Sequence, residues 1–381
     1  MIPYGKQCID QTDIDAVVEI LQGDWLTQGP TIEKFEEALA MYCGAKFAVA
    51  VSSGTAALHL ANLALGVKRG DKVVTTPISF VATSNSILYV GGEPVFCDIQ
   101  GDTINIDPDA VRKKLRGTDD VKGIIPVHMG GLSADLENLA KIAKENDLWI
   151  IEDACHAIGG RWRDSKGKEH RVGDCAFSDL TVFSFHPVKH ITTGEGGAIT
   201  TNDKNLYDQL LELRTHGISK DSEKLEENHG GWYYEMRELG FNYRITDIQA
   251  ALGIQQLRRS DEWVSRRQAL VNVYDEAFSD IPELNMQLHP MDQFPAYHLY
   301  IVRAKDREGL YNHLKEKTIF AQVHYIPIHL QPFYRQHFGT GPGDLPEAEA
   351  YYREALSLPL FPTMSSEDQQ NVIVAVREYY A

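Results

Sequence analysis

The stretch FAVAVSSGTAALHLANLALGVKRGDKVVTT, residues 47–76, decides the fold class of this chain. It begins with a short apolar run, turns at a Ser-Ser-Gly-Thr segment, continues as an apolar helix-like segment and ends in a run rich in valine and threonine. Two buried strands joined by a helix are typical of a parallel sheet, because parallel neighbours need a long crossover connection. The stretch therefore predicts a β-α-β unit.

The same region raises the question of a membrane span. Phe47 to Val67 carries no charged residue and is long enough to cross a bilayer. The Ser-Ser-Gly-Thr turn, His59 and Asn62 interrupt it, however, and membrane-spanning segments are normally more uniformly apolar. We therefore expect a strand and a helix of a globular domain, and no membrane partner.

The alternation continues on both sides of this unit. An amphipathic helix is predicted over residues 30–45, and helix-like segments separate most of the further apolar runs. Buried runs alternating with helices favour an α/β fold, with a mostly parallel sheet covered by helices on both faces. The runs predict a seven-stranded sheet in the large domain, with strands at 47–51, 72–76, 94–98, 123–127, 148–152, 181–185 and 198–201 and helices near 55–66, 81–90, 108–116 and 133–146.

The pattern changes in the last third of the chain. Residues 219–231 are polar and predict a mobile loop. Thr246 to Gln249 form a capping-box sequence, which predicts a long helix over about 246–279 that connects two domains. The sequence thus predicts a large domain, 1–250, and a smaller α+β C-terminal domain, 251–381, with strands at 298–304 and 321–328 and helices at 306–316 and 366–379.

Composition excludes several classes of protein. The chain has 381 residues, of which 43% are hydrophobic and 24% charged, as in ordinary globular proteins. Its net charge of −17 argues against nucleic acid and anionic membranes as partners, because the long-range field repels both. Five scattered cysteines form no C-x-x-C pair, so neither a disulfide framework nor a zinc site is expected. The first residues lack an apolar signal segment, and we expect a cytoplasmic protein.

Chemistry-bearing residues follow several of the predicted strands. In open parallel sheets, ligands bind outside the carboxyl ends of the strands. Ser53-Gly54-Thr55 opens a helix and suits a phosphate, although a plain capped turn has the same sequence. Asp153 is either a helix cap or the partner of a cationic nitrogen, and Lys189 is either a solvated loop residue or an amine nucleophile of lowered pKa.

Taken together, these groups indicate a function more specifically than any one of them does alone. An amine, a carboxylate, an aromatic ring and a phosphate-binding turn are what pyridoxal 5′-phosphate (PLP) requires. The chain has no Walker motif and no G-x-G-x-x-G sequence, which speaks against a nicotinamide oxidoreductase. The sequence therefore predicts a PLP site.

With these motifs assembled, the sequence resembles the DegT-type family of PLP-dependent nucleotide-sugar aminotransferases of fold type I. The resemblance covers nearly the whole chain. Within the family, LTQG, TTPISFVAT and AQVHY are most similar to the 4-aminotransferases of pseudaminic acid biosynthesis. The resemblance rests on WLTQGP (25–30), VSSGTAALH (51–59), TTPISFVATSNS (75–86), EDACHA (152–157), VFSFHPVKHITTGEGGA (182–198), LGFNYRITDIQAALG (239–253) and AQVHYIPIH (321–329).

The resemblance implies roles for the matching positions around the cofactor. Lys189 would carry the cofactor as a Schiff base and shuttle protons, and the cofactor would alternate with pyridoxamine phosphate. Asp153 would pair with the pyridine nitrogen, and His156 would lie near the phenolic oxygen. Phe80 would stack on the ring. The phosphate would be held by Gly54, Thr55, Ser184 and, from the neighbouring subunit of a homodimer with shared active sites, Asn242.

The resemblance also implies substrates. L-glutamate would donate the amino group, and a UDP-linked 4-keto-6-deoxy-N-acetylhexosamine would accept it at C4. A different UDP- or dTDP-linked keto sugar, a PLP-dependent sugar dehydratase and a non-catalytic regulatory or binding protein on the same fold remain alternatives. The residues implied for the sugar nucleotide are Tyr4, Asp24, Trp25, Leu26, Thr27, Val323, His324, Tyr325 and Ile326.

Overall fold

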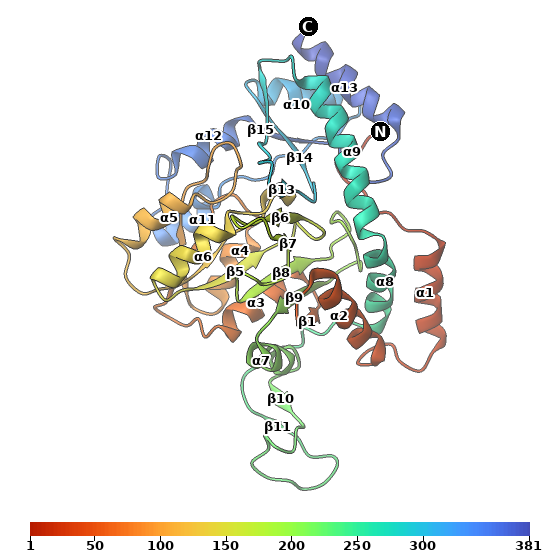
Figure 1. Cartoon of the computed structure of the whole chain (residues 1–381), viewed down its shortest axis with the longest axis vertical. Coiled ribbons are helices and arrows are strands. Elements are labelled where there is room, and N and C mark those ends of the chain that lie inside the picture. Colours follow the sequence, from red (N-terminus) through yellow and green to blue (C-terminus); the bar gives the residue numbers. More distant parts are fainter.

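A seven-stranded sheet forms the centre of the computed structural model, which describes residues 1–381 (Figure 1). The strand order is β1-β9-β8-β5-β4-β2-β3, and every strand is parallel to the others except β9. All seven predicted strands belong to it, so the expected mostly parallel sheet is confirmed. The strands are β1 (Phe47–Val51), β2 (Lys72–Thr75), β3 (Glu93–Phe96), β4 (Val121–Ile125), β5 (Trp149–Asp153), β8 (Leu180–Ser184) and β9 (Gly197–Thr201).

Helices cover both faces of this sheet because its strands are apolar on both sides. In β1, Ala48 and Ala50 pack into the core beneath α2, whereas Val49 and Val51 pack into the core beneath α3. The second face also carries α4 and α7, and the first carries α5, α6 and α8. These helices are α2 (Pro30–Cys43), α3 (Gly54–Ala64), α4 (Ala82–Tyr89), α5 (Pro108–Leu115), α6 (Leu136–Glu145), α7 (Lys204–Arg214) and α8 (Asp247–Arg258).

The C-terminal part has its own antiparallel sheet, in the order β12-β14-β15, and its own core. Ile2 joins this core and pairs with Ile319, so the first residues lie against the last third of the chain. Our division of the chain at residue 250 stays a proposal. The elements here are α9 (Ser260–Phe278), β12 (Leu284–Met286), β14 (Tyr300–Ala304), α10 (Arg307–Glu316), α11 (Pro332–Phe338), α12 (Pro346–Glu354), β15 (Ala355–Leu358), α13 (Ser366–Tyr380) and the 3-10 turn Ile328–Leu330.

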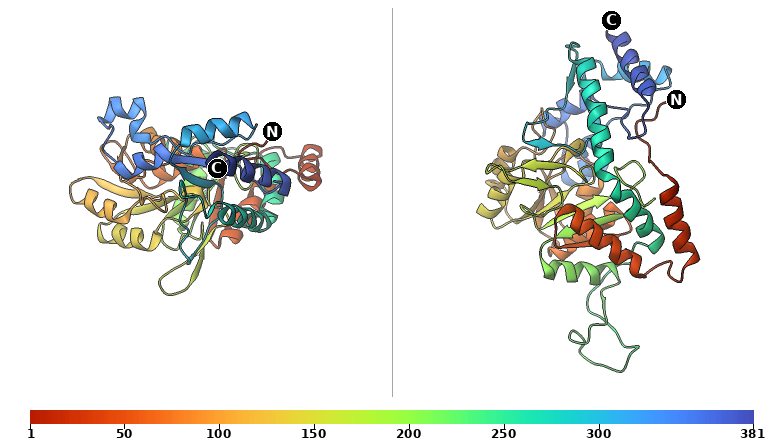
Figure 2. Two further views of the ribbon diagram at one scale, coloured as in Figure 1. Left: turned by 90° about the horizontal axis from the view of Figure 1, so that it is seen from above. Right: turned by 45° about the vertical axis from the view of Figure 1, so that its right-hand side comes forward.

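The predicted single helix over 246–279 is wrong in one respect, because the segment consists of two helices. The capping box is present, with Gln249 N–H donating to Thr246 Oγ1 over 3.2 Å. The break comes at Arg259, whose backbone leaves helical geometry at φ −103° and ψ 3°. Its guanidinium pairs with Asp10 and Asp13 at the start of α1 (Gln11–Gln22), so this contact accompanies the change of direction (Figure 2, right).

The predicted strand over 321–328 is also wrong. Only Gln322 makes a bridge, to Ser357, and residues 323–327 form no regular secondary structure. Pro327 lacks an N–H for a sheet ladder, and the 3-10 turn follows it. The segment therefore places His324 and Tyr325 beside the main sheet instead of in a second one.

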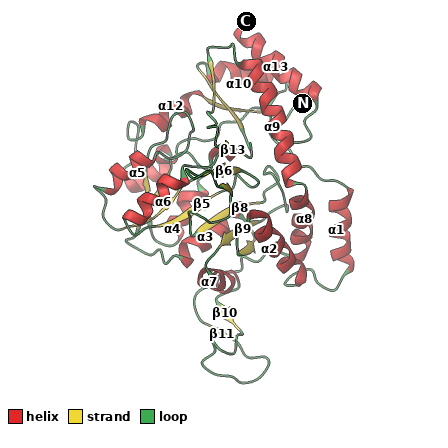
Figure 3. Ribbon diagram, viewed as in Figure 1, coloured by secondary structure: helices red, strands yellow, loops and turns green.

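The structure also contains short strands and turns that the sequence patterns did not predict. Strands β10 (Ile218–Ser219) and β11 (Glu235–Met236) join the ends of an arm that projects from the body and is mostly loop (Figure 3). A small sheet is formed by β6 (Arg161–Arg163), β7 (Glu169–Arg171) and β13 (Gln293–Phe294), and a 3-10 turn spans Met129–Gly131. No helix combines the length and apolarity that crossing a bilayer requires.

Candidate active site

A cavity of about 500 Å³ opens at the carboxyl ends of the parallel strands. The segments that follow β1, β2, β4, β5 and β8 all contribute to its wall, as expected from the convergence of strand ends. The C-terminal part closes another side. The predicted site residues that line it are Tyr4, Gly54, Thr55, Phe80, Asp153, His156, Ser184, Lys189, His324 and Tyr325.

Lys189 lies on the loop after β8, where its backbone N–H donates to His186 O over 2.8 Å. Burial lowers the pKa of its ammonium group, and the nearby Cys155 and Asp153 only partly oppose this shift. A lower pKa makes the neutral amine, which is the nucleophilic form, easier to reach. The position and the environment of Lys189 therefore suit an amine nucleophile and proton carrier.

Asp153 ends β5 with its carboxylate held from two sides. Thr83 Oγ1 donates to Oδ2 over 2.6 Å, and the Cys155 N–H donates to Oδ1 over 3.2 Å. Because the Thr83 proton is committed to the carboxylate, the 2.6 Å contact between Thr83 and Ser79 uses the Ser79 proton. This chain of donors orients the carboxylate and leaves lone pairs for a cationic partner in the cavity.

The surroundings of His156 favour the neutral form of its imidazole. Burial holds its pKa well below the usual range, and Lys189, His324 and His190 add to the effect. Its Nε2 lies 3.0 Å from the Tyr325 hydroxyl, and its ring centroid lies 4.4 Å from that of His298. Its Nδ1 is buried without a partner in the chain, which fits a bound polar group at this position.

The turn before α3 forms a close-fitting cradle. Ser53 caps the helix, its Oγ accepting from Ala56 N–H over 3.0 Å. A Cβ atom on Gly54 would lie only 2.9 Å from the Ser184 Cβ, so the helix start and the end of β8 touch here. First-turn N–H groups have no intrahelical acceptors and favour an anion. The cradle, the amine, the carboxylate and the partnerless imidazole nitrogen together fit PLP.

We expect Gly54→Ala to weaken binding of PLP. The added methyl group has to displace Ser184 or the helix start, and either movement disturbs the proposed phosphate contacts. Titrating the apoprotein with PLP and following its absorbance measures the effect. Gly117→Ala is the matched control, because a Cβ there meets no atom within 4 Å. Equal affinities for the two variants would contradict the assignment of the cradle.

The remaining predicted residues lie outside this cavity. Trp25 and Leu26 are exposed by 56% and 48% on a loop whose end, Thr27, pairs with Thr246; Asp24 is exposed beside them. Asn242 is also exposed. Of the C-terminal segment, Val323 packs against the core and Ile326 is 47% exposed.

Thr83 and His298 are two of the lining residues that were not predicted. Thr83 follows Phe80 by one helical turn within TTPISFVATSNS, and this spacing could have indicated it. His298 opens a strand-like run, and no local pattern distinguishes it from a structural histidine. It enters the site only because the C-terminal part folds back on the sheet.

Comparison with known proteins gives consistent matches over the whole length. Residues 7–377 match the sequence model of the DegT/DnrJ/EryC1/StrS aminotransferase family. Spore coat polysaccharide biosynthesis protein SpsC of Bacillus subtilis is 39% identical over 99% of this chain and 96% of its own length. The UDP-4-amino-4,6-dideoxy-N-acetyl-beta-L-altrosamine transaminase of Campylobacter jejuni is 38% identical over 98% of this chain and 96% of its own.

Solved structures agree with these matches. Helicobacter pylori PseC, an aminotransferase involved in the biosynthesis of pseudoaminic acid, superposes with a TM-score of 0.90 at 34% identity, covering 100% of this chain and 99% of its own. The PLP form of the putative sugar aminotransferase Spr1654 from Streptococcus pneumoniae gives 0.90 at 28% identity, covering 100% of each chain.

Proposed function

The chain belongs to the DegT/DnrJ/EryC1/StrS aminotransferase family, and from this premise we propose that it transfers an amino group from L-glutamate to C4 of a UDP-linked 4-keto-6-deoxy-N-acetylhexosamine. It is a PLP-dependent sugar aminotransferase of fold type I. The observation that carries the site assignment is the meeting of Lys189 and Asp153 in one cavity with the cradle at Gly54.

The names of two relatives support the proposed sugar. The Campylobacter relative is named for a UDP-linked 4-amino-4,6-dideoxy sugar, and the Helicobacter structure for pseudoaminic acid biosynthesis. We therefore propose the pseudaminic acid pathway, which supplies surface and flagellin sugars. SpsC, at a similar identity, is named for a spore coat polysaccharide, so another UDP- or dTDP-linked 4-keto-6-deoxy sugar is the second candidate.

Lys189 carries the proton transfers in this proposal. PLP, when bound, supplies an electron-accepting ring that stabilises negative charge on a substrate carbon. The Lys189 Nζ removes a proton from one carbon and delivers it to another, and its lowered pKa eases both steps. The same residue therefore serves the glutamate and the sugar halves of the reaction.

The other residues of the site would bind and orient the cofactor. Asp153 would hold the pyridine nitrogen in its protonated form, because an ionised carboxylate favours a nearby positive charge. His156, which is hydrogen-bonded to Tyr325, would lie near the phenolic oxygen. Gly54, Thr55 and Ser184 hold the phosphate, and Phe80, which is 59% exposed, offers its ring for stacking.

The sugar nucleotide and the second subunit complete the proposal. Tyr4, His324 and Tyr325 line the cavity, whereas residues 24–27 and 323 and 326 lie beyond it. We propose that these outer residues bind the nucleotide, and that the exposed Asn242 reaches the cofactor phosphate of a partner in a homodimer. Five unpaired cysteines accord with a reducing cytoplasm as the proposed compartment.

Amination assays with a panel of UDP- and dTDP-linked 4-keto-6-deoxy sugars test the proposed substrate. We expect 2-oxoglutarate to form from glutamate over many turnovers only when the UDP-linked N-acetylated sugar is present, with product stereochemistry read by NMR. A preference for a dTDP-linked sugar would show that the proposed UDP-linked sugar is not the substrate. Loss of a hydroxyl without release of 2-oxoglutarate would favour a dehydratase, and a protein that acquires no PLP absorbance after reconstitution would favour a non-catalytic role.

A further inference from the structure

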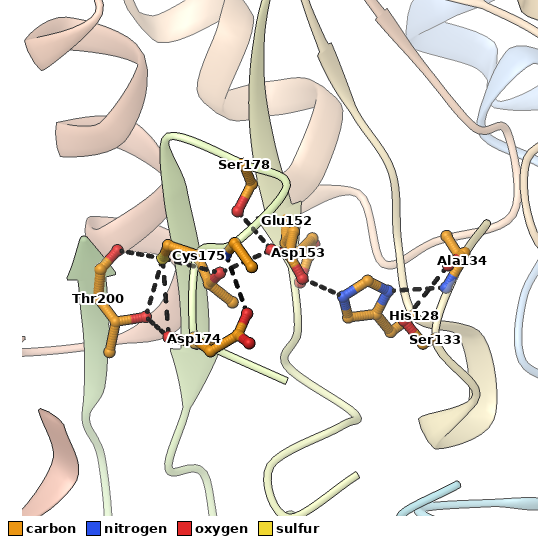
Figure 4. A network of polar contacts seen from close by, with 12 residues as sticks. His128, Ser133, Ala134, Glu152, Asp153, Asp174, Cys175, Ser178 and Thr200 are labelled. Carbon is orange, nitrogen blue, oxygen red and sulfur yellow. Dashed lines mark hydrogen bonds and ion pairs between the residues drawn. The ribbon is translucent and has the colours of Figure 1, made fainter. Parts of the chain in front are cut away.

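A buried polar network adjoins Asp153, which lines the cavity (Figure 4). At its centre is Glu152, which precedes Asp153 on β5 and is 2% exposed. Its Oε2 lies 2.7 Å from His128 Nε2, and its Oε1 accepts from Ser178 Oγ and, over 3.0 Å, from Thr181 Oγ1. His128 is fully buried, so the pair has no contact with solvent.

The direction of these hydrogen bonds is fixed by chemistry. The backbone N–H of Ala134 donates to His128 Nδ1 over 3.0 Å, so that nitrogen carries no proton. His128 therefore carries its proton on Nε2 and donates it to Glu152. Glu152 acts as an acceptor only, toward an imidazole and two hydroxyl groups. Reversal of the Glu152–His128 contact would move the imidazole proton to Nδ1, where it would face the Ala134 N–H.

The network is tied to the site by backbone contacts. The His128 N–H donates to Asp153 O over 3.1 Å, and the Asp153 N–H donates to Pro126 O over 2.9 Å. Past His128, Gly131 O accepts from Ala296 N–H over 3.0 Å, two residues before the cavity residue His298. The Glu152–His128 bond thus links the end of β5 to the segment 128–131, which contacts the chain just before the cavity residue His298.

We propose that Glu152 and His128 are positioning residues, whose hydrogen bond fixes the Asp153 carboxylate against the cofactor nitrogen. The proposal rests on the role of Asp153 in the proposed function and on no particular sugar. Neither Glu152 nor His128 lines the cavity, so their effect passes through the backbone of Asp153. Rigid placement matters because displacement of a reacting group by about 1 Å costs on the order of 100-fold in rate.

Glu152→Gln tests the proposal with almost no change of shape. Ser178 and Thr181 keep one oxygen as an acceptor, which turns the new amide group toward the His128 Nε2 proton. We expect the pH at which the absorbance of bound PLP changes to shift from that of the unmodified enzyme, and single-turnover conversion by glutamate to slow about 10-fold. Both measurements need no keto sugar, so they remain informative if the proposed sugar is wrong.

A double variant separates positioning from general destabilisation. In Glu152→Gln/His128→Glu, the carboxylate at 128 can accept both from the new amide at 152 and from the Ala134 N–H. We therefore expect the spectral titration to return toward normal although two buried residues have changed. The ionisable groups that face Asp153, namely Cys155, Lys189 and Tyr325, are the same in all variants.

Glu36→Gln is the matched control. Glu36 is also a buried carboxylate, paired with Arg214 and with the Ala50 N–H, but it lies on α2, away from β5. We expect this variant to lower the thermal unfolding temperature and leave the titration unchanged. If Glu152→Gln titrates like the unmodified enzyme, or if the double variant is no closer to normal than the single one, Glu152 and His128 do not position Asp153.

Discussion

We expect replacement of Lys189 by alanine to abolish turnover and to remove the borohydride-reducible link between PLP and the protein. Lys189 is the amine that the fold places in the cavity with Asp153, and burial lowers its pKa. The variant loses proton transfer at two carbons, and a positioned acid–base group contributes about 10²–10⁴-fold at each such step. Reduction with borohydride followed by peptide mass analysis locates the link, and a coupled assay for 2-oxoglutarate measures turnover.

The exposed Lys166 provides the control. Lys166→Ala should keep both the link and the activity, which shows that the effect belongs to the position and not to loss of any lysine. Partial recovery of Lys189→Ala by added methylamine would support the role of a free amine. Full activity of Lys189→Ala without any addition would refute the assignment of Lys189.

The second large effect is expected for Asp153→Asn. The amide has nearly the same shape and can accept from Thr83 Oγ1, so the fold should survive. It cannot supply the negative charge that keeps the pyridine nitrogen protonated. We expect turnover to fall by about 10²–10³-fold, as when an electrostatic partner of the transition state is removed. The absorbance spectrum of the bound cofactor should change with it.

Asp179→Asn is a control on the same pair of strands. The Asp179 Oδ2 accepts from the Ile150 N–H over 2.8 Å, near the start of β5 and outside the cavity. We expect this variant to keep most of its turnover and an unchanged cofactor spectrum. Near-normal turnover of Asp153→Asn would show that the ring nitrogen does not depend on this carboxylate.

The sequence was sufficient for elements that carry their own local signal. Each strand of the main sheet is a short apolar run bounded by turn residues, and the capping box marks the start of α8. The break at Arg259 has no such signal, because it accompanies a contact with Asp10 and Asp13 some 250 residues away in the chain. The segment 321–328 alternates like a strand, yet only Gln322 forms a bridge.

The site also contains residues that the sequence predicts and residues that it does not. Lys189, Asp153 and the turn at Gly54 follow predicted strands, so the edge of the sheet where they meet follows from topology. The hydrogen bond from Thr83 to Asp153 depends on how α4 sits on the sheet, and the entry of His298 depends on how the C-terminal part docks. Neither placement is encoded in a short stretch of sequence.

The position of β9 has a consequence for the order in which the chain can fold. β1, made from residues 47–51, pairs within the sheet only with β9, made from residues 197–201. A growing chain on the ribosome therefore exposes the ladder edge of its first strand until β9 has emerged. Such pairing between distant residues raises the contact order and slows folding. The proposed phosphate cradle at the end of β1 lies against Ser184 at the end of β8, which emerges shortly before β9, so cofactor capture by nascent chains should begin late in synthesis.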